Sequence, residues 1–568
     1  MPKQRGSWAA PGDVNAFFGL MLDNVAGLIL LVTLLSATSG ISTNFILQHM
    51  VPGTAVGVLV ADLLFFFLTL GMGRREGRSD ITAMPLGLDT PSTYGMILFV
   101  LGPAYSAMAA ELSVDGQLSV AAQARAERFA WHVGIASIFM SGLLKFCFVA
   151  GSGWLRRMLP RAGLLGSLAS IALVLIAFLP FLEVLHQPVI GFVALGIVLA
   201  TLVGKVRLPG NIPGALGAVL VAGGLYYAMQ ASDGWLGTHL LEIDKPDFDA
   251  YAALGPTGWL NAFRFEWVQD FGAATAYLPI VLPLALATVV GGIDCTESAA
   301  AAGDEFHTGT VIGVEAFSTL VASLCGGVIQ TTPYIGHPAY KAMGGRAAYV
   351  LATALFVGLL GLSGGFAYLY ILIPKPIVFP ILIFIGLEIT AQSFHATPQR
   401  HYPAVALACV PALAVLGGLF AGKAMTDPTQ ILPQAQTELA ITGMLANGFI
   451  LTSLFWASGL AMVIDRRWWI ATIIFALCGL MTLVGLIHSP LPSGSMYLPT
   501  NFGWGALDGW RLTDPAALRR VHEFAAGYLL IAIMTGLAAA WTPRGDDAEG
   551  DASDADHLAV SIPATEEQ

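Results

Sequence analysis

The sequence predicts an all-α polytopic membrane protein made of two groups of seven membrane segments. Of the 568 residues, 56% are hydrophobic and only 11% are charged, and the mean hydropathy is +0.73. Soluble domains carry about 25% charged residues, so this composition argues against a soluble fold. Apolar stretches near the roughly 20 residues that cross a bilayer recur along the chain.

Sixteen apolar segments can be read from the chain, and each is taken as a predicted membrane segment. They lie at residues 20–45, 54–73, 82–105, 128–150, 163–182, 188–204, 212–231, 275–302, 309–328, 329–344, 347–364, 367–391, 403–421, 439–463, 468–487 and 523–541. The first fourteen fall into two groups of seven, separated by an acidic insert. Because seven is odd, the second group enters the membrane from the opposite side, as in inverted-repeat transporters.

The third segment of each group carries two prolines and a glycine. The first reads MPLGLDTPSTYG at 84–95, and the second reads TPYIGHPAYKAMGG at 332–345. Proline removes a helical hydrogen bond and clashes with the preceding turn, so both segments are predicted to be extended up to the second proline. A half-helix is expected to start there, capped by Asp89 or Thr90 in the first case and with His337 in the matching place in the second.

Lysine and arginine in short loops predict the orientation, with both termini cytoplasmic in a plasma (inner) membrane. No cleavable signal peptide is expected, because the first apolar segment has membrane-spanning length. The parts expected are a cytoplasmic N-terminus at 1–14, repeats at 15–231 and 275–463, an external insert at 232–274, two additional helices within 464–541 joined by an external loop at 488–522, and an acidic, disordered cytoplasmic tail at 542–568.

The net charge of -11 does not indicate a basic or acidic partner. The last 25 residues, from Arg544, hold eight acidic residues and one arginine, which accounts for most of the excess. No basic stripe suggests nucleic acid. All five cysteines lie in apolar segments without CxxC spacing, so neither a metal site nor a disulfide framework is predicted.

Two carboxylates stand inside the apolar segment VVGGIDCTESAAAAGDEF. Asp294 and Glu297 are three residues apart, so on a helix they share a face. An acid at the membrane centre costs roughly 2.5–3.5 kcal/mol on the lenient insertion scale, and such residues normally face a cavity and carry function. The pair is predicted to bind a coupling H⁺ or Na⁺. Asp304 and Glu305 are expected at the membrane surface.

Three further charged residues stand alone in apolar runs, and their roles stay open between a gating contact and a structural interhelical pair. They are Asp62, Lys145 and Glu388. No GxxxxGK[ST], HExxH or GxSxG motif occurs, so ATP-driven transport and an enzymatic role are not expected.

The ATVVGGIDCTES helix, TTPYIGHPAYKAMGGR and PKPIVFPILIFIGLEI together resemble the xanthine/uracil permease (nucleobase:cation symporter-2) superfamily, nearest its hypoxanthine/guanine permease-like branch. The resemblance covers roughly residues 15–463. It implies a seven-plus-seven transporter with core and gate domains and broken third and tenth helices, and a purine-like nucleobase as substrate. It also implies that Asp294 matches the eighth-helix acid that holds the ring, while Glu297 stands where the family usually has a glycine.

The site residues that follow from the pattern and the resemblance are all on three segments. For substrate binding they are Asp294, Glu297, Tyr334, Gly336, His337, Asp89, Thr90 and Thr332, and for coupling Glu297, Asp294 and His337. No metal or cofactor is expected beyond the coupling ion. The expected partners are the small-molecule substrate and membrane lipid, with a homodimer as a possibility.

Two alternatives stay open. One keeps the fold but makes the substrate an inorganic or carboxylate anion, as in the sulfate permease family; two acids near the site then require that protons travel with a multivalent anion. The other is a membrane-embedded enzyme or sensor whose tail or insert binds a partner, for which the sequence supplies no catalytic set.

Overall fold

The computed structural model describes residues 8–114, 117–149, 160–236, 249–334, 336–424, 433–491, 496–497 and 512–541. The predicted acidic tail lies outside these residues, as do parts of the predicted insert and of the loop at 488–522. The chain divides into two compact units, one of residues 1–155 and 175–387 and the other of residues 156–174 and 388–568.

Within the described residues, ten helices are long and apolar enough to cross a membrane, or up to twelve if each of two bent pairs forms one span. The ten are Gly12–Ser39, Thr43–Glu76, Thr90–Leu112, Val120–Val149, Ala162–His186, Gly214–Asp233, Phe271–Ala300, Lys375–His395, Gln399–Gly422 and Pro515–Trp541. The chain is therefore an all-helical, polytopic membrane protein, as predicted.

The sixteen predicted segments differ from these spans where the helices break. Two pairs bend sharply, Ala348–Ser363 with Phe366–Leu372 by 98° and Ala435–Ala446 with Phe449–Ile464 by 75°. Three more apolar helices are shorter than a full span, at Pro188–Val203, Thr308–Leu324 and Trp468–Leu483. The segment predicted at 329–344 is a strand followed by a half-helix. The seven-plus-seven inverted symmetry stays a prediction.

In the first unit, long helices surround two short strands. The bounds are α1 Gly12–Ser39, α3 Val51–Glu76, β1 Leu86–Leu88, α4 Thr90–Met96, α5 Gly102–Leu112, α6 Val120–Val149, α9 Phe178–His186, α10 Pro188–Val198, α11 Gly214–Leu236, α13 Leu278–Ala301, α14 Thr308–Leu324, β2 Thr331–Pro333, α15 His337–Ala342, α16 Ala348–Ser363, α17 Phe366–Leu372 and α18 Lys375–His395, of which the last turns belong to the second unit. Close packing through glycine joins some of these helices, since a Cβ on Gly57 of α3 would lie 2.8 Å from Ala322 of α14.

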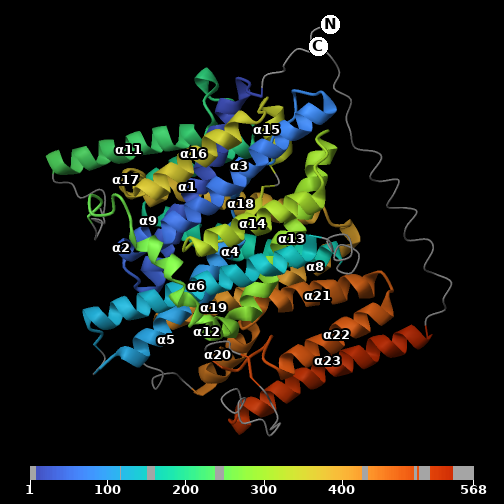
Figure 1. Ribbon diagram of the computed structural model, residues 1–568. Coiled ribbons are helices and arrows are strands. Elements are labelled where there is room, and N and C mark those ends of the chain that lie inside the picture. The colour runs from blue at the N-terminus through green and yellow to red at the C-terminus, as the bar shows by residue number, and fades with distance from the viewer. Residues whose placement is uncertain are drawn as a thin grey trace. The chain divides into compact units, whose positions relative to one another are not determined.

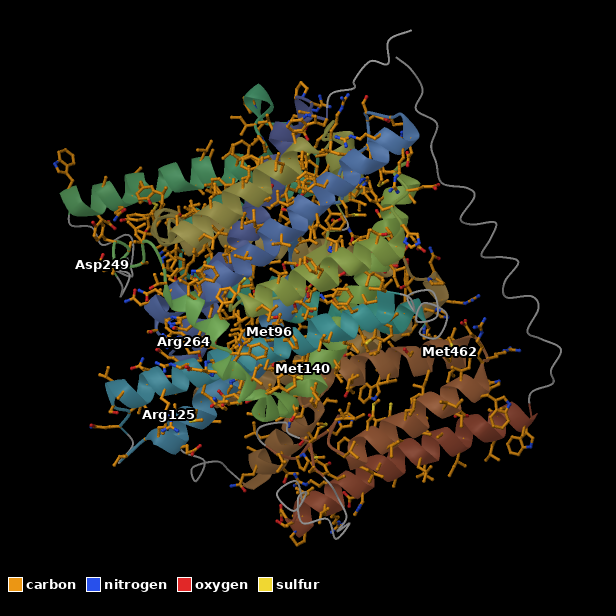
Figure 2. The ribbon with its side chains drawn as sticks, viewed as in Figure 1. Met96, Arg125, Met140, Asp249, Arg264 and Met462 are labelled. Atoms are coloured by element: carbon orange, nitrogen blue, oxygen red, sulfur yellow. The ribbon has the colours of Figure 1, made fainter. Side chains whose placement is uncertain are left out.

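The expected external insert forms a compact cap where it is described. Short 3₁₀ turns run over Gly258–Arg264 and Glu266–Val268, followed by α12 at Phe271–Ala274. Asp270 Oδ2 lies 2.7 Å from His132 Nδ1 of α6, and Trp267 is buried. These contacts tie the insert to α6; Figure 1 labels α6 and α12, and Figure 2 labels Arg264 of the insert.

The second unit contains α8 (Arg161–Ile171), α19 (Tyr402–Ala424), α20 (Pro433–Ala446), α21 (Phe449–Ile464), α22 (Trp468–Leu483) and α23 (Pro515–Trp541). Its centre is rich in alanine, and Ser453 Oγ donates to the Ala408 carbonyl at 2.6 Å. Small residues let helix backbones approach closely in a membrane, where packing replaces the hydrophobic effect as the driving force. Figure 1 shows α22 and α23 side by side.

Candidate functional site

The two proline-broken segments meet in the first unit as a short antiparallel ribbon. Strand β1 pairs with β2 in the register Leu86↔Pro333, Gly87↔Thr332 and Leu88↔Thr331. Each strand is followed by a helix, α4 from Thr90 and α15 from His337. Three residues of strand span roughly 10 Å, so the two helices start at opposite ends of one small ribbon and run away from each other.

The first half-helix is capped as predicted, but the second is not. Asp89 Oδ2 accepts a hydrogen bond from Ser92 N at 3.0 Å. The carboxylate therefore satisfies one free N–H group and interacts favourably with the positive end of the α4 dipole. At α15 the N-cap residue is Gly336, with no side-chain cap. The expectation that His337 takes the capping place is therefore wrong, because the helix starts at His337 itself.

Helix α13 carries the two predicted carboxylates alongside β2. Cys295 Sγ donates to the Pro333 carbonyl at 3.4 Å, which fixes this turn of α13 against the strand. Its neighbour Asp294, and Glu297 one turn on, are half-buried. A helix can hold two carboxylates at membrane depth when they face a polar cavity or a partner.

The predicted residues on the broken segments differ in exposure. Asp89 and Thr90 are buried, whereas Thr332, Tyr334 and Gly336 are half-buried. Tyr334 N donates to the Pro85 carbonyl at 2.8 Å, which extends the ribbon by one bond. The structure thus brings Asp89, Thr90, Thr332 and Tyr334 to the ribbon and sets α13 next to it.

A buried ion pair lies behind the ribbon. Lys145 Nζ on α6 is 2.7 Å from Glu315 Oε1 on α14, and both side chains are 0% exposed. The same ammonium group donates to the Thr331 carbonyl at 3.3 Å. Lys145, which the sequence left open between gating and pairing, therefore forms an interhelical pair that also holds β2. Sequence reasoning missed Glu315, although a lone acid in the apolar run of α14 is a signal of the same kind as Asp294.

Neutral polar groups connect this pair to the ribbon. Ser141 Oγ donates to Gln330 Oε1 at 2.6 Å, and Asp89 N donates to the Gln330 carbonyl at 3.1 Å. Ser318 Oγ and Thr331 Oγ1 are 2.8 Å apart. Non-helical backbone at membrane depth needs such buried partners, so the network explains how the ribbon is tolerated.

Asp304 lies just after the end of α13, as expected, but it forms a second buried cluster and is not solvated. Its side chain is 0% exposed, with Oδ1 2.7 Å from Lys341 Nζ and 3.0 Å from Arg78 Nη2. Thr82 N donates to Asp304 Oδ2 at 3.0 Å. His337 Nε2 lies 3.1 Å from the Thr82 carbonyl and 3.5 Å from Asp304 Oδ2. The neighbour Glu305 is exposed, as expected.

The Asp304 cluster fastens three segments of the first unit, namely the loop after α3, the loop after α13, and α15. Arg78 also donates to Asp80 at 3.1 Å, and this hydrogen bond holds the pKa of the Asp80 carboxyl below its usual value. His337 is fully buried in this cluster. Its role as a coupling residue stays a prediction, and its observed contacts are structural.

The arrangement defines a class of protein. Two membrane segments are broken at their middle and paired through strands, and an acid-bearing helix lies beside them. The chain is an all-helical, polytopic membrane protein with an interrupted pair of segments inside its first unit.

No family model and no curated protein matches the chain. Solved structures do match. The transmembrane domain of a cyanobacterium bicarbonate transporter, BicA, shares 14% identity and covers 79% of this chain and 97% of its own, with a TM-score of 0.42. A structure of SLC26A9 shares 12% identity, covering 70% of this chain and 61% of that one, with a TM-score of 0.41. The murine SLC26A9 anion transporter, in its inward-facing state, shares 13% identity and covers 72% of this chain and 66% of its own, with a TM-score of 0.40.

These results correct the assignment to the xanthine/uracil permease superfamily, and with it the purine-like substrate. The matched structures are named as a bicarbonate transporter and an anion transporter.

Proposed function

We propose that the chain is a secondary active transporter that carries a small anion together with a proton or a sodium ion. The site is the β1–β2 ribbon with the starts of α4 and α15 and the acidic face of α13. The observation that supports the proposal is the antiparallel pairing of Gly87 with Thr332, because it joins the two interrupted segments in one ribbon with a half-helix N-terminus at each end.

Helix N-termini attract anions through their free N–H groups and the positive end of the helix dipole. The two ends differ here. The α4 terminus already holds the Asp89 carboxylate, whereas α15 starts after Gly336 without a side-chain cap. We therefore place the anion nearer to α15, with Thr332 and Tyr334 beside it.

The carboxylates explain why a cation has to travel with the anion. Lys145 and Glu315 cancel each other as a 2.7 Å pair. Asp294 and Glu297 lie on α13, which is fixed against β2 by the Cys295 contact, and a proton or sodium ion bound by these carboxylates would reduce the repulsion between them and an anion. Binding of the cation and of the anion at this point would then favour each other, which is the thermodynamic basis of symport.

The cycle involves no covalent step, so no catalytic residue is assigned. We propose that the transporter assembles as a homodimer in the lipid bilayer, with a complete site in each copy of the chain.

The experiment is uptake of labelled bicarbonate, sulfate, chloride and a small carboxylate by liposomes containing the full chain. We expect uptake of at least one anion to rise at least tenfold with an inward proton or sodium gradient. Asp294→Asn and Glu297→Gln should abolish that dependence, and Glu305→Gln, a matched change at an exposed acid, should preserve it. Uptake of no anion under either gradient would overturn the substrate class. Gradient-driven uptake unchanged in both α13 variants would overturn the coupling role.

A further inference from the structure

An apolar groove runs between α21, α22 and α23, in the unit that does not contain the ribbon. Its volume is about 720 Å³, within the 300–1,000 Å³ range of ligand pockets. The walls include Leu460 and Trp456 of α21, Trp468 and Phe475 of α22, and Met534 of α23. Figure 2 labels Met462, which marks the end of α21 next to this groove.

Helix α23 supplies one continuous face of the groove. The lining residues Phe524, Gly527, Tyr528, Ile531, Met534, Thr535 and Ala538 follow the spacing of one helix side. From the first to the last the helix rises roughly 21 Å at 1.5 Å per residue. The hydrocarbon core of a bilayer is about 30 Å thick, so the groove has the length of an acyl chain in one leaflet rather than of a full span.

The polar atoms at the floor of the groove are hydrogen-bonded to one another or to the backbone. Trp456 Nε1 donates to Tyr528 Oη at 2.7 Å, and Tyr528 Oη donates to His488 Nε2 at 2.6 Å. His488 Nδ1 donates to the Met444 carbonyl at 3.2 Å. When the His488 imidazole is neutral, every donor in this series of hydrogen bonds has an acceptor, so this wall of the groove offers only apolar atoms to an occupant.

The end of the groove near the start of α22 is different. Trp468 lines the groove, and its buried Nε1–H has no hydrogen-bond partner among the described residues. Arg466 and Arg467, directly before it, are exposed. An unpaired indole N–H, preceded in the chain by two exposed arginines, suits an anionic oxygen, because arginine binds phosphate through several N–H groups.

We propose that this groove holds one anionic glycerophospholipid. An acyl chain lies along α23 from Ala538 towards Phe524, and the head-group phosphate accepts a hydrogen bond from Trp468 Nε1 and pairs with Arg467. The groove lies at membrane depth because α23 is one of the membrane-spanning helices. Apolar complementarity retains the tail, and the charges at one end select the head group.

Gly527 allows a sharp test because a Cβ there meets no atom within 4 Å. Gly527→Phe places an aromatic ring in the groove from a position with free space for its Cβ. Leu530→Phe is the matched control, since Leu530 is 61% exposed and lies outside the lining. Trp468→Phe and Arg467→Gln probe the head-group end.

The full chain, purified in mild detergent, is incubated with phosphatidylglycerol or phosphatidylcholine, and native mass spectrometry counts retained lipids. We expect one retained phosphatidylglycerol on wild type and Leu530→Phe, at least tenfold less on Gly527→Phe, and three- to tenfold less on Trp468→Phe and Arg467→Gln. Equal retention by all variants, meaning exchangeable surface lipid only, would overturn the proposal. So would equal retention of both lipids, or a dimer that dissociates with Gly527→Phe, which would assign the groove to a second copy of the chain.

Discussion

The buried pair of Lys145 and Glu315 gives the most direct physical test of the first unit. The perturbation is a set of three variants, Lys145→Met, Glu315→Leu and the double change. Each single change leaves one charge at 0% exposure without its partner, 2.7 Å away in the native protein. The Lys145 change also removes the donor to the Thr331 carbonyl at 3.3 Å.

The magnitude follows from burial and distance. At an effective dielectric constant of 20, two unit charges 2.7 Å apart attract by about 6 kcal/mol. In the wild type, the cost of desolvating the two charges cancels most of this attraction. In a single variant the remaining charge still bears its desolvation cost but has no partner, so the free energy of unfolding should fall by about 3–5 kcal/mol. The double variant replaces both charges by apolar groups of similar volume and should recover to within about 1–2 kcal/mol of wild type.

The assay is unfolding in detergent followed by tryptophan fluorescence, with the three variants compared as a double-mutant cycle. The expected order of stability is wild type, then the double variant, then the two single variants together. Single variants within 1 kcal/mol of wild type, or losses that add in the double variant, would refute the charge-pair reasoning.

Three other predictions concern separate sites. Asp89→Ala should cost about 0.5–2 kcal/mol of unfolding free energy by removing the Ser92 cap, and Asp89→Asn should retain most of it; an equal loss in both would contradict capping. Burial lowers the pKa of His488 to about 4 from 6.5, so between these pH values the unfolded chain binds more protons than the folded chain. The free energy of unfolding should therefore be highest above pH 6.5 and fall by up to about 3 kcal/mol as the pH drops to 4. Melting temperatures measured against pH should show this loss in the wild type and not in His488→Asn. Asp304→Asn should weaken three contacts at once and lower the melting temperature more than Glu305→Gln, with equal shifts counting against the buried cluster.

Much of the broken-segment architecture could be predicted because proline acts locally. Two prolines five or six residues apart disfavour a continuous helix, and the structure has a strand before each half-helix. The cap at Asp89 followed from the same local rule. The pairing of the strands with each other did not, because hydrogen bonding between distant segments leaves no trace in local spacing.

Two predictions about single residues were wrong, those for His337 and Asp304. His337 was matched to the capping place by analogy with the first segment, but spacings in the two segments differ by a residue or two, and the helix starts one residue earlier than a cap requires. Asp304 was expected to be solvated because it follows the end of an apolar segment. Its burial depends on Arg78 and Lys341, two cations from other segments that only the tertiary fold brings to it.

The substrate was the least predictable feature. Short motifs in apolar helices are built from the few residue types that membranes tolerate, so an aspartate and a Pro–Gly pattern do not select one transporter family. Glu315 shows the opposite failure, since a general rule on buried charge would have selected it and attention to motifs passed it over.

The β1–β2 ribbon also constrains how the protein is made. Leu88 and Thr331 are more than 240 residues apart, so α4 and its strand emerge from the ribosome long before their partner exists. During that interval the N–H and C=O groups of the first strand have no ladder, at several kcal/mol for each group exposed to lipid. Until β2 is synthesised, water or other protein groups must satisfy the backbone of the first strand, so the ribbon is completed only late in synthesis.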